Sequence, residues 1–219
     1  MAKAGKWEPA LDLFSLMSSS DVAHDTISSA TISACERSGQ WTTALDILAR
    51  MPSLRIVVDS VALASAISAL EKGQQWERAV SLLFEEAGAK VNYVGLSAAI
   101  SSCEKAGQWE AACELLRYAT LAFIKADAVA FGATIAACSR TGEWQQAIGL
   151  LQQMELEHIR RDGVACTAAV TACTNSAAWS EAISLVGSML AEMMQADAFA
   201  YSAVLSACDA AERWEEAMV

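Results

Sequence analysis

A stripe of side chains that could bind a ligand recurs along the chain. In the helix expected over residues 61–71 and just beyond it, Val61, Ala64, Ser68 and Lys72 follow at separations of 3, 4 and 4 positions, so they share one helical face. The stripe occurs six times and opens at Thr26, Val61, Val94, Val129, Val164 and Phe199. An apolar residue opens five of the six stripes, a small and often hydroxyl-bearing residue follows, and a basic residue closes four. Apolar contact, hydroxyl hydrogen bonds and positive charge together suit ligand binding.

The residue sets that usually support catalysis or metal binding are missing from the sequence. It holds no Ser-His-Asp order, no paired-carboxylate motif, no Gly-rich phosphate loop and no zinc-ligand spacing. His24 and His158 have no partner pattern, and a surface histidine is the simplest interpretation of both. We therefore expect no enzyme activity, no metal and no cofactor.

The elements that must position the stripe are set by a sequence repeat. Successive tryptophans are separated by 34, 35, 33, 35, 35 and 35 residues, and each is followed three positions later by alanine. The tryptophans are Trp7, Trp41, Trp76, Trp109, Trp144, Trp179 and Trp214. Such a period is typical of a solenoid built from one supersecondary unit, here two helices, of which the second begins near the tryptophan. We expect the small alanine to let the helices approach closely and the tryptophan to fill the space beside it.

The repeats join the whole chain into one array. Full repeats span 25–59, 60–92, 93–127, 128–162 and 163–197, and partial repeats span 1–24 and 198–219. Neither end shows the polar capping repeat that normally closes a solenoid, so we expect a fragment of a longer array. The expected fold class is all-α, a right-handed superhelical solenoid of two-helix repeats.

The cysteines repeat in register with the tryptophans. Five of the seven lie six residues before a tryptophan, and Leu70 takes the sixth such place. These five are Cys35, Cys103, Cys138, Cys173 and Cys208. A position that accepts cysteine or leucine is an apolar packing position, and free thiols fit a reducing compartment.

Charge and hydropathy bound the choice of partners. The formal net charge is −11 at pH 7, which disfavours nucleic-acid binding. The acidic residues gather in the second helices, however, so the stripe on the first helices can differ in sign from the whole chain. No secretory signal opens the sequence, and the uncharged stretch 163–180 contains too many hydroxyl and amide side chains for a membrane span.

The repeat resembles the pentatricopeptide repeat family over essentially the whole chain. The resemblance rests on the 35-residue period, the block from Ile32 to Trp41, the alanine and paired leucines after the tryptophan, and a methionine near the end of the second helix. Those methionines are Met17, Met51, Met154 and Met189. The sequence departs from the family where a Pro-Asp often closes a repeat, because here the Asp stands without Pro.

The resemblance implies sequence-specific binding of single-stranded RNA, one base per repeat, by three kinds of residue. The small residue of each stripe would read the base together with the last residue of the repeat: Ser29 with Asp59, Ala64 with Asn92, Ser97 with Asp127, Gly132 with Asp162, Thr167 with Asp197, and Ser202 in the partial repeat. The bases would be sandwiched by Val61, Val94, Val129, Val164 and Phe199. The phosphates would be faced by Arg37, Lys72, Lys105 and Arg140. The family further implies a role in organellar RNA processing, stability or translation, in a plastid or mitochondrion, although the sequence contains no transit peptide.

Structural interpretations of the same residues stay open. The repeat-closing Asp residues could cap the next first helix, and the hydroxyl stripe could be an ordinary solvated face. The basic residues lie near helix C-termini, where the helix dipole favours cations in any case. Glu36, Glu71 and Glu104 lie beside them and dilute their charge. The alternative function is a helical-repeat scaffold whose groove holds a protein or peptide partner.

Overall fold

The computed structural model describes residues 25–54, 56–85, 91–191, 202 and 205. Within these residues the regular structure consists of ten α-helices and one short 3-10 helix. They are α2 (Asp25–Ser38), α3 (Trp41–Arg50), η1 (Pro52–Leu54), α4 (Ser60–Lys72), α5 (Trp76–Glu85), α6 (Tyr93–Ala106), α7 (Trp109–Leu121), α8 (Ala128–Thr141), α9 (Trp144–Leu156), α10 (Gly163–Asn175) and α11 (Trp179–Ala191). In this part of the chain, none of the helices combines the length and the apolar composition that crossing a membrane requires.

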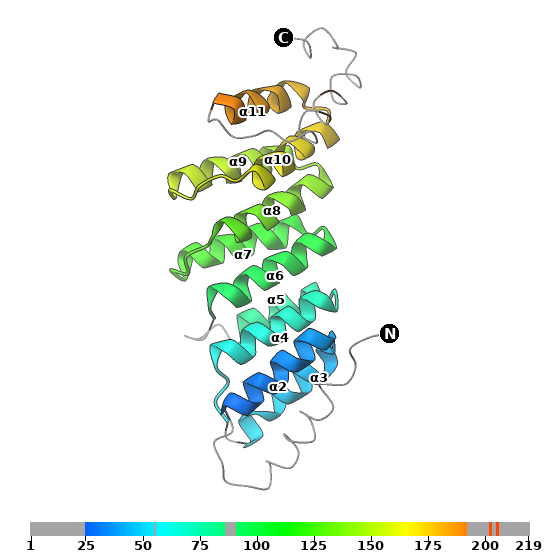
Figure 1. The fold of residues 1–219 in the computed structure, drawn as a ribbon, viewed down its shortest axis with the longest axis vertical. Coiled ribbons are helices and arrows are strands. Elements are labelled where there is room, and N and C mark those ends of the chain that lie inside the picture. The colour runs from blue at the N-terminus through cyan, green and yellow to red at the C-terminus, as the bar shows by residue number, and fades with distance from the viewer. Residues whose placement is uncertain (1–24, 55, 86–90, 192–201, 203–204, 206–219) are drawn as a thin grey trace. The chain divides into compact units, whose positions relative to one another are not determined.

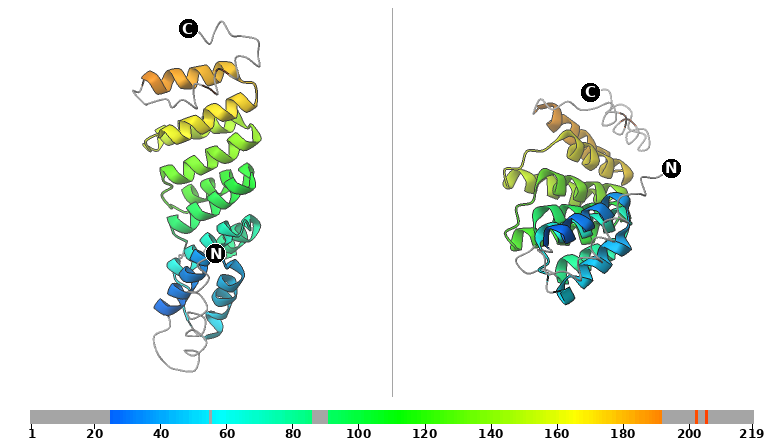
Figure 2. Two further views of the ribbon diagram at one scale, coloured as in Figure 1. Left: turned by 45° about the vertical axis from the view of Figure 1, so that its right-hand side comes forward. Right: turned by 60° about the horizontal axis from the view of Figure 1, so that its bottom comes forward.

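The chain forms two compact units, residues 1–102 and 103–219, and the same helix pairing occurs inside each. In the first, α2 packs on α3 and α4, and α4 also packs on α3 and α5 (Figure 1). In the second, α8 packs on α7, α9 and α10, and α10 also contacts α9 and α11 (Figure 2). First helices thus lie against both their own second helix and the next first helix. The predicted all-helical repeat solenoid is confirmed.

Small residues make the close helix contacts. The alanine three positions after each described tryptophan is fully buried, at 0% exposure in Ala44, Ala79, Ala112, Ala147 and Ala182. Leu115 and Leu116 of α7, at 0% and 2%, show how the rest of a second helix fills the core. Burying such leucines contributes about 1.5–3 kcal/mol each, and the alanines permit the approach that makes this burial possible.

The described tryptophans, expected to fill the space beside the alanine, are not fully buried. The described tryptophans from Trp41 to Trp179 are only partly buried, because each opens the second helix at the end of the pair. Trp41 shows what the ring does there. A Cβ atom added to Gly73 would collide with its side chain, and the guanidinium of Arg78 lies 4.9 Å from the ring centroid. The ring therefore packs between the turn and the second helix of the next repeat.

The turn between the two helices of a repeat contains one left-handed residue, two positions before the tryptophan. Glycine takes this place in three repeats, at Gly39, Gly107 and Gly142, where φ is 72°, 68° and 79°. Gln74 and Ala177 take it in two others with φ of 55° and 56°. The following backbone N–H closes the turn by donating to the carbonyl at the cysteine position, as Gln108 does to Cys103 at 2.9 Å.

Exchanging glycine and alanine at these turns tests the backbone argument. We expect Ala177→Gly to raise the free energy of unfolding by about 0.5–1 kcal/mol, because a Cβ atom is disfavoured in the left-handed region. Gly107→Ala should lower it by about 1–2 kcal/mol through backbone strain alone, since no atom lies within 4 Å of the new Cβ. Urea unfolding measures both. Equal effects of the same sign would contradict the argument.

The cysteines that precede the tryptophans belong to the core, as their register predicts. Cys35, Cys103, Cys138 and Cys173 are at 0% exposure, and Cys208 lies outside the described residues. Burial raises the pKa of Cys103 and of Cys173 to about 11, so both thiols stay protonated at neutral pH. In the described parts of the chain, no three His, Cys, Asp or Glu side chains could hold a metal ion together.

Cys113 of α7 has a different environment. It is partly exposed and lines a shallow cleft with Trp109 and Arg117. A hydrogen bond from its neighbour Cys138 of α8 lowers the pKa of the Cys113 thiol and outweighs the opposing effect of burial. The partner thiol is affected in the opposite sense, so the pKa of Cys138 is raised.

These thiols should differ in their reaction with iodoacetamide, because the thiolate is the nucleophile. We expect Cys113 to be alkylated first near neutral pH, and Cys103 and Cys173 to react only on unfolding or at strongly alkaline pH. Peptide mass mapping over time gives the order. Cys138→Ala should slow the reaction of Cys113 by removing the bond that lowers its pKa. Labelling of Cys103 as fast as Cys113 would refute the assignment.

Candidate nucleic-acid interface

The apolar residue that opens each stripe is exposed. Val61, Val94, Val129 and Val164 are the second residues of α4, α6, α8 and α10, with exposures of 54%, 41%, 63% and 74%. Next to Val61, Ala62 and Leu63 are at 0% and 1%, so the helix turns its core face away from the stripe. Phe199 lies outside the described residues. Four of the five predicted sandwiching residues therefore present apolar surface to solvent.

The small residues of the stripe fall into two groups. Gly132, Ser97 and Thr167 are partly exposed, and Ser202 is exposed. A Cβ atom on Gly132 would find no atom within 4 Å, so the surface above it is open. Ser29 and Ala64, at 7% and 6%, are instead buried.

The residue that closes each described repeat caps the next first helix. The side chain of Asp59 accepts a hydrogen bond from the Ala62 N–H at 2.7 Å. The same bond runs to Asn92 from Gly95 at 2.9 Å, to Asp127 from Ala130 at 2.9 Å and to Asp162 from Ala165 at 2.8 Å. Each is worth about 0.5–2 kcal/mol as an N-cap. The capping interpretation of these residues is thus confirmed.

The structure brings one predicted base-reading pair into direct contact. The Ser29 hydroxyl donates to both carboxylate oxygens of Asp59, at 3.1 and 3.2 Å, while Asp59 also caps α4. In the following repeat the Asn92 amide donates to the Ser60 carbonyl at 3.4 Å, and Ala64 offers no side-chain polar atom. Asp197 lies outside the described residues, so its pairing with Thr167 is not described.

Asp127 and Asp162, two other predicted base-reading residues, have a different hydrogen-bond pattern. The cap bond of Asp127 and that of Asp162 each use the Oδ1 oxygen. In the part of the chain that the structure describes, their Oδ2 oxygens accept no hydrogen bond, which leaves an acceptor for a ligand. Gly132, the predicted partner of Asp162, adds open space and no polar atom.

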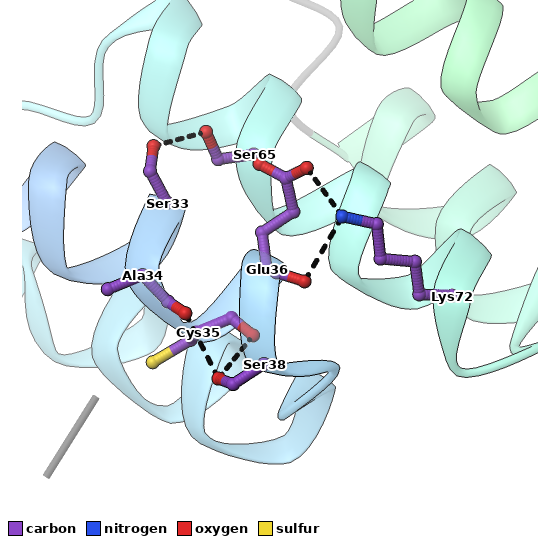
Figure 3. Close-up of polar contacts among 7 residues, drawn as sticks. All are labelled: Ser33, Ala34, Cys35, Glu36, Ser38, Ser65 and Lys72. Carbon is purple, nitrogen blue, oxygen red and sulfur yellow. Dashed lines mark hydrogen bonds and ion pairs between the residues drawn. The ribbon is translucent and has the colours of Figure 1, made fainter. Parts of the chain in front are cut away.

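Two of the predicted phosphate-facing residues are already paired with acids of the preceding repeat. Figure 3 shows Lys72 reaching both the carboxylate and the backbone carbonyl of Glu36. Lys72 Nζ lies 2.9 Å from Glu36 Oε1 and 3.2 Å from the Glu36 carbonyl oxygen. Arg140 Nη2 lies 2.9 Å from Glu104 Oε1. Arg37 and Lys105 are exposed. Helical periodicity missed these partners because it relates residues three or four apart, whereas each pair is 36 residues apart.

The same contact recurs where no basic residue is present. Asn175 closes the stripe of α10, and its Nδ2 donates to the Ser139 carbonyl at 2.8 Å, again across 36 residues. Ser33 and Ser65 share a further hydroxyl bond of 2.9 Å between α2 and α4 (Figure 3). The stripe is therefore bordered by polar bonds between successive first helices. Its accessible parts include the four valines and the small residues Ser97, Gly132 and Thr167, which suit contact with flat, partly polar groups.

Comparison with known proteins agrees with this repeat architecture. A family model described as PPR repeat matches residues 1–22, 28–56 and 129–159. No curated protein matches the chain significantly. Among solved structures, the pentatricopeptide repeat protein PPR10 from maize is similar with a TM-score of 0.76 at 21% identity, covering 96% of this chain and 32% of that one.

Two similar structures contain RNA. The complex of PPR10 with an 18-nt psaJ RNA element has a TM-score of 0.72 at 21% identity, covering 100% of this chain and 31% of that one. The PPR domain of Arabidopsis thaliana protein-only RNase P 1 in complex with tRNA has a TM-score of 0.67 at 11% identity, covering 85% of this chain and 96% of that one. The present chain thus spans about a third of the length of PPR10. The three matched segments identify PPR repeats in this chain, and its two-helix fold agrees with that of the pentatricopeptide repeat structures.

Proposed function

We propose that this chain binds single-stranded RNA along the stripe of its first helices, with one base at each repeat. The observation that carries the proposal is the exposed valine, which stands two positions after the capping residue in four successive repeats. An apolar side chain at a constant register can contact the face of any base. Two of the similar structures, those with the psaJ element and with tRNA, are RNA complexes, which supports this choice of ligand.

Base choice would follow from the small residue and the capping residue. A hydroxyl can donate to or accept from a base edge, and a carboxylate can accept from the amino and imino groups of guanine. Guanine would then be favoured by three pairs: Ser29 with Asp59, Ser97 with Asp127, and Thr167 with Asp197. The repeats that contain Ala64 and Gly132 would discriminate poorly between the four bases. The expected preference is G-N-G-N-G, with the RNA 5′ end at the protein N-terminus. By family resemblance, the protein would act in RNA processing, RNA stability or translation in a plastid or mitochondrion.

A helical-repeat scaffold for a protein or peptide is the second candidate. The observation that favours it is the pairing of Lys72 and Arg140 with glutamates, which reduces the positive charge available to phosphate. Fluorescence anisotropy with a G-containing single-stranded RNA separates the two. Binding that weakens steeply between about 50 and 200 mM salt supports RNA. No binding by the folded protein at about 10 µM or above would support the scaffold.

Gly132 offers a gain-of-function test of base reading. Gly132→Thr places a hydroxyl in open space beside the Asp162 repeat, so we expect guanine to become favoured at that base by about two- to tenfold, the worth of one hydrogen bond. Anisotropy with RNAs that vary only this base measures the change.

The matched control is Gly149→Thr. Gly149 also has no atom within 4 Å of its Cβ position, but it lies on α9, the second helix of the repeat. Both variants gain a similar helix propensity, so stability changes should be alike. If Gly132→Thr discriminates no better than the control, the stripe does not read bases at this repeat.

A further inference from the structure

The ends of successive first helices are tied together by one repeated polar contact. Lys72 reaches Glu36, Arg140 reaches Glu104 and Asn175 reaches Ser139, each across 36 residues. Lys72 and Asn175 also donate to backbone carbonyls in the last turn of the preceding first helix. Each of these carbonyls also accepts a backbone hydrogen bond from the following turn, from Gly39 to Glu36 at 3.2 Å and from Gly142 to Ser139 at 3.3 Å, and each lies at the negative end of its helix dipole. The contact therefore adds a second donor, from the neighbouring repeat, at a helix C-terminus.

The two ion pairs leave their cations accessible. The side chains of Lys72 and Arg140 are 44% and 55% exposed, whereas Glu36 and Glu104 are 25% and 19% exposed. The carboxylates thus lie more deeply against the protein, with the cations on their solvent side. A phosphate could approach either cation from solvent, but it would have to compete with a carboxylate already in hydrogen-bonding contact.

We propose that Glu36 and Glu104 regulate RNA affinity by holding the stripe cations in pairs that a phosphate must open. The proposal rests on the proposed function and concerns the backbone of the same RNA. A cation that gives up a carboxylate to pair with a phosphate contributes little net binding free energy. These repeats therefore contribute less to RNA affinity than their basic residues suggest. An exposed pair of this kind is worth up to about a fivefold change in an equilibrium constant, which sets the size of the effect.

The contact at Asn175 is the same helix-to-helix contact in a repeat that has no glutamate at the partner position. Its partner position holds Ser139, which offers a carbonyl and no carboxylate. Asn175→Lys would therefore add a stripe cation whose partner position carries no carboxylate. We expect this variant to gain more RNA affinity than any change that frees a cation already present.

The test compares RNA affinity and its salt dependence across matched variants. Glu36→Gln and Glu104→Gln should each tighten RNA binding by about two- to fivefold. Each should also steepen the slope of log K against log salt concentration by about 0.7, because one additional phosphate contact on a single strand changes the slope by that amount. Glu114→Gln, an exposed site on α7, is the control for the change in net charge and should alter both quantities less. The probe is the G-containing single-stranded RNA, and thermal unfolding confirms that each variant is folded.

A double variant assigns the effect to the pair. Arg140→Gln should have a small effect alone and should cancel the gain when combined with Glu104→Gln, because the freed cation is then missing. If wild type binds RNA and Glu104→Gln matches Glu114→Gln, the glutamates do not regulate binding and the inference fails while the proposed function stands. If no variant binds, Asn175→Lys included, the proposed function fails and the inference fails with it. Binding by Glu104→Gln but not by wild type supports the inference, whereas binding by Asn175→Lys alone supports the proposed function and overturns the inference.

Discussion

The carboxylate or amide that caps each first helix is the contact on which the interface depends. It fixes the residue at which the helix begins, as Asp162 does for α10 through the Ala165 N–H. Because a helix has 3.6 residues per turn, the starting residue also determines which side chains face solvent. The exposed valine always follows two positions after the cap and the small residue five positions after it. A cap shifted by one residue would rotate the stripe by about 100° toward the core.

The cap also links the recognition residues to the stability of the array. Asp59 holds the start of α4 and at the same time accepts the hydroxyl of Ser29 from α2. A residue fixed on both sides presents its carboxylate in one orientation and loses little conformational freedom when a ligand arrives. Substitution at such a position therefore changes binding and stability together, so measured affinities need a parallel measurement of folding.

The sequence predicted the fold and the exposed stripe because both follow from periodicity. The spacing of Val61, Ala64, Ser68 and Lys72 defines a helical face whatever its neighbours are. Periodicity shows which helical face a side chain belongs to, but not how deeply that side chain is buried. It marked the tryptophans as constant without showing that they lie at the edge of the helix pair, and it did not distinguish the buried Ala64 from the open Gly132. The pairing of Lys72 with Glu36 depends on how far one repeat rises above the last, which only the packed structure contains.

The contact between Trp41 and Gly73 bears on how such arrays can be rebuilt. The ring belongs to one repeat and the glycine that makes room for it belongs to the next, so the sequence period and the packing module have different boundaries. A chimera that exchanges residues 60–92 as one cassette would separate the two and place the ring against whatever residue the donor turn carries. Cutting instead directly before each tryptophan would keep Trp41 and Gly73 together in one segment, residues 41–75. Modular engineering of this array is therefore better guided by contact surfaces than by the repeat as written in sequence.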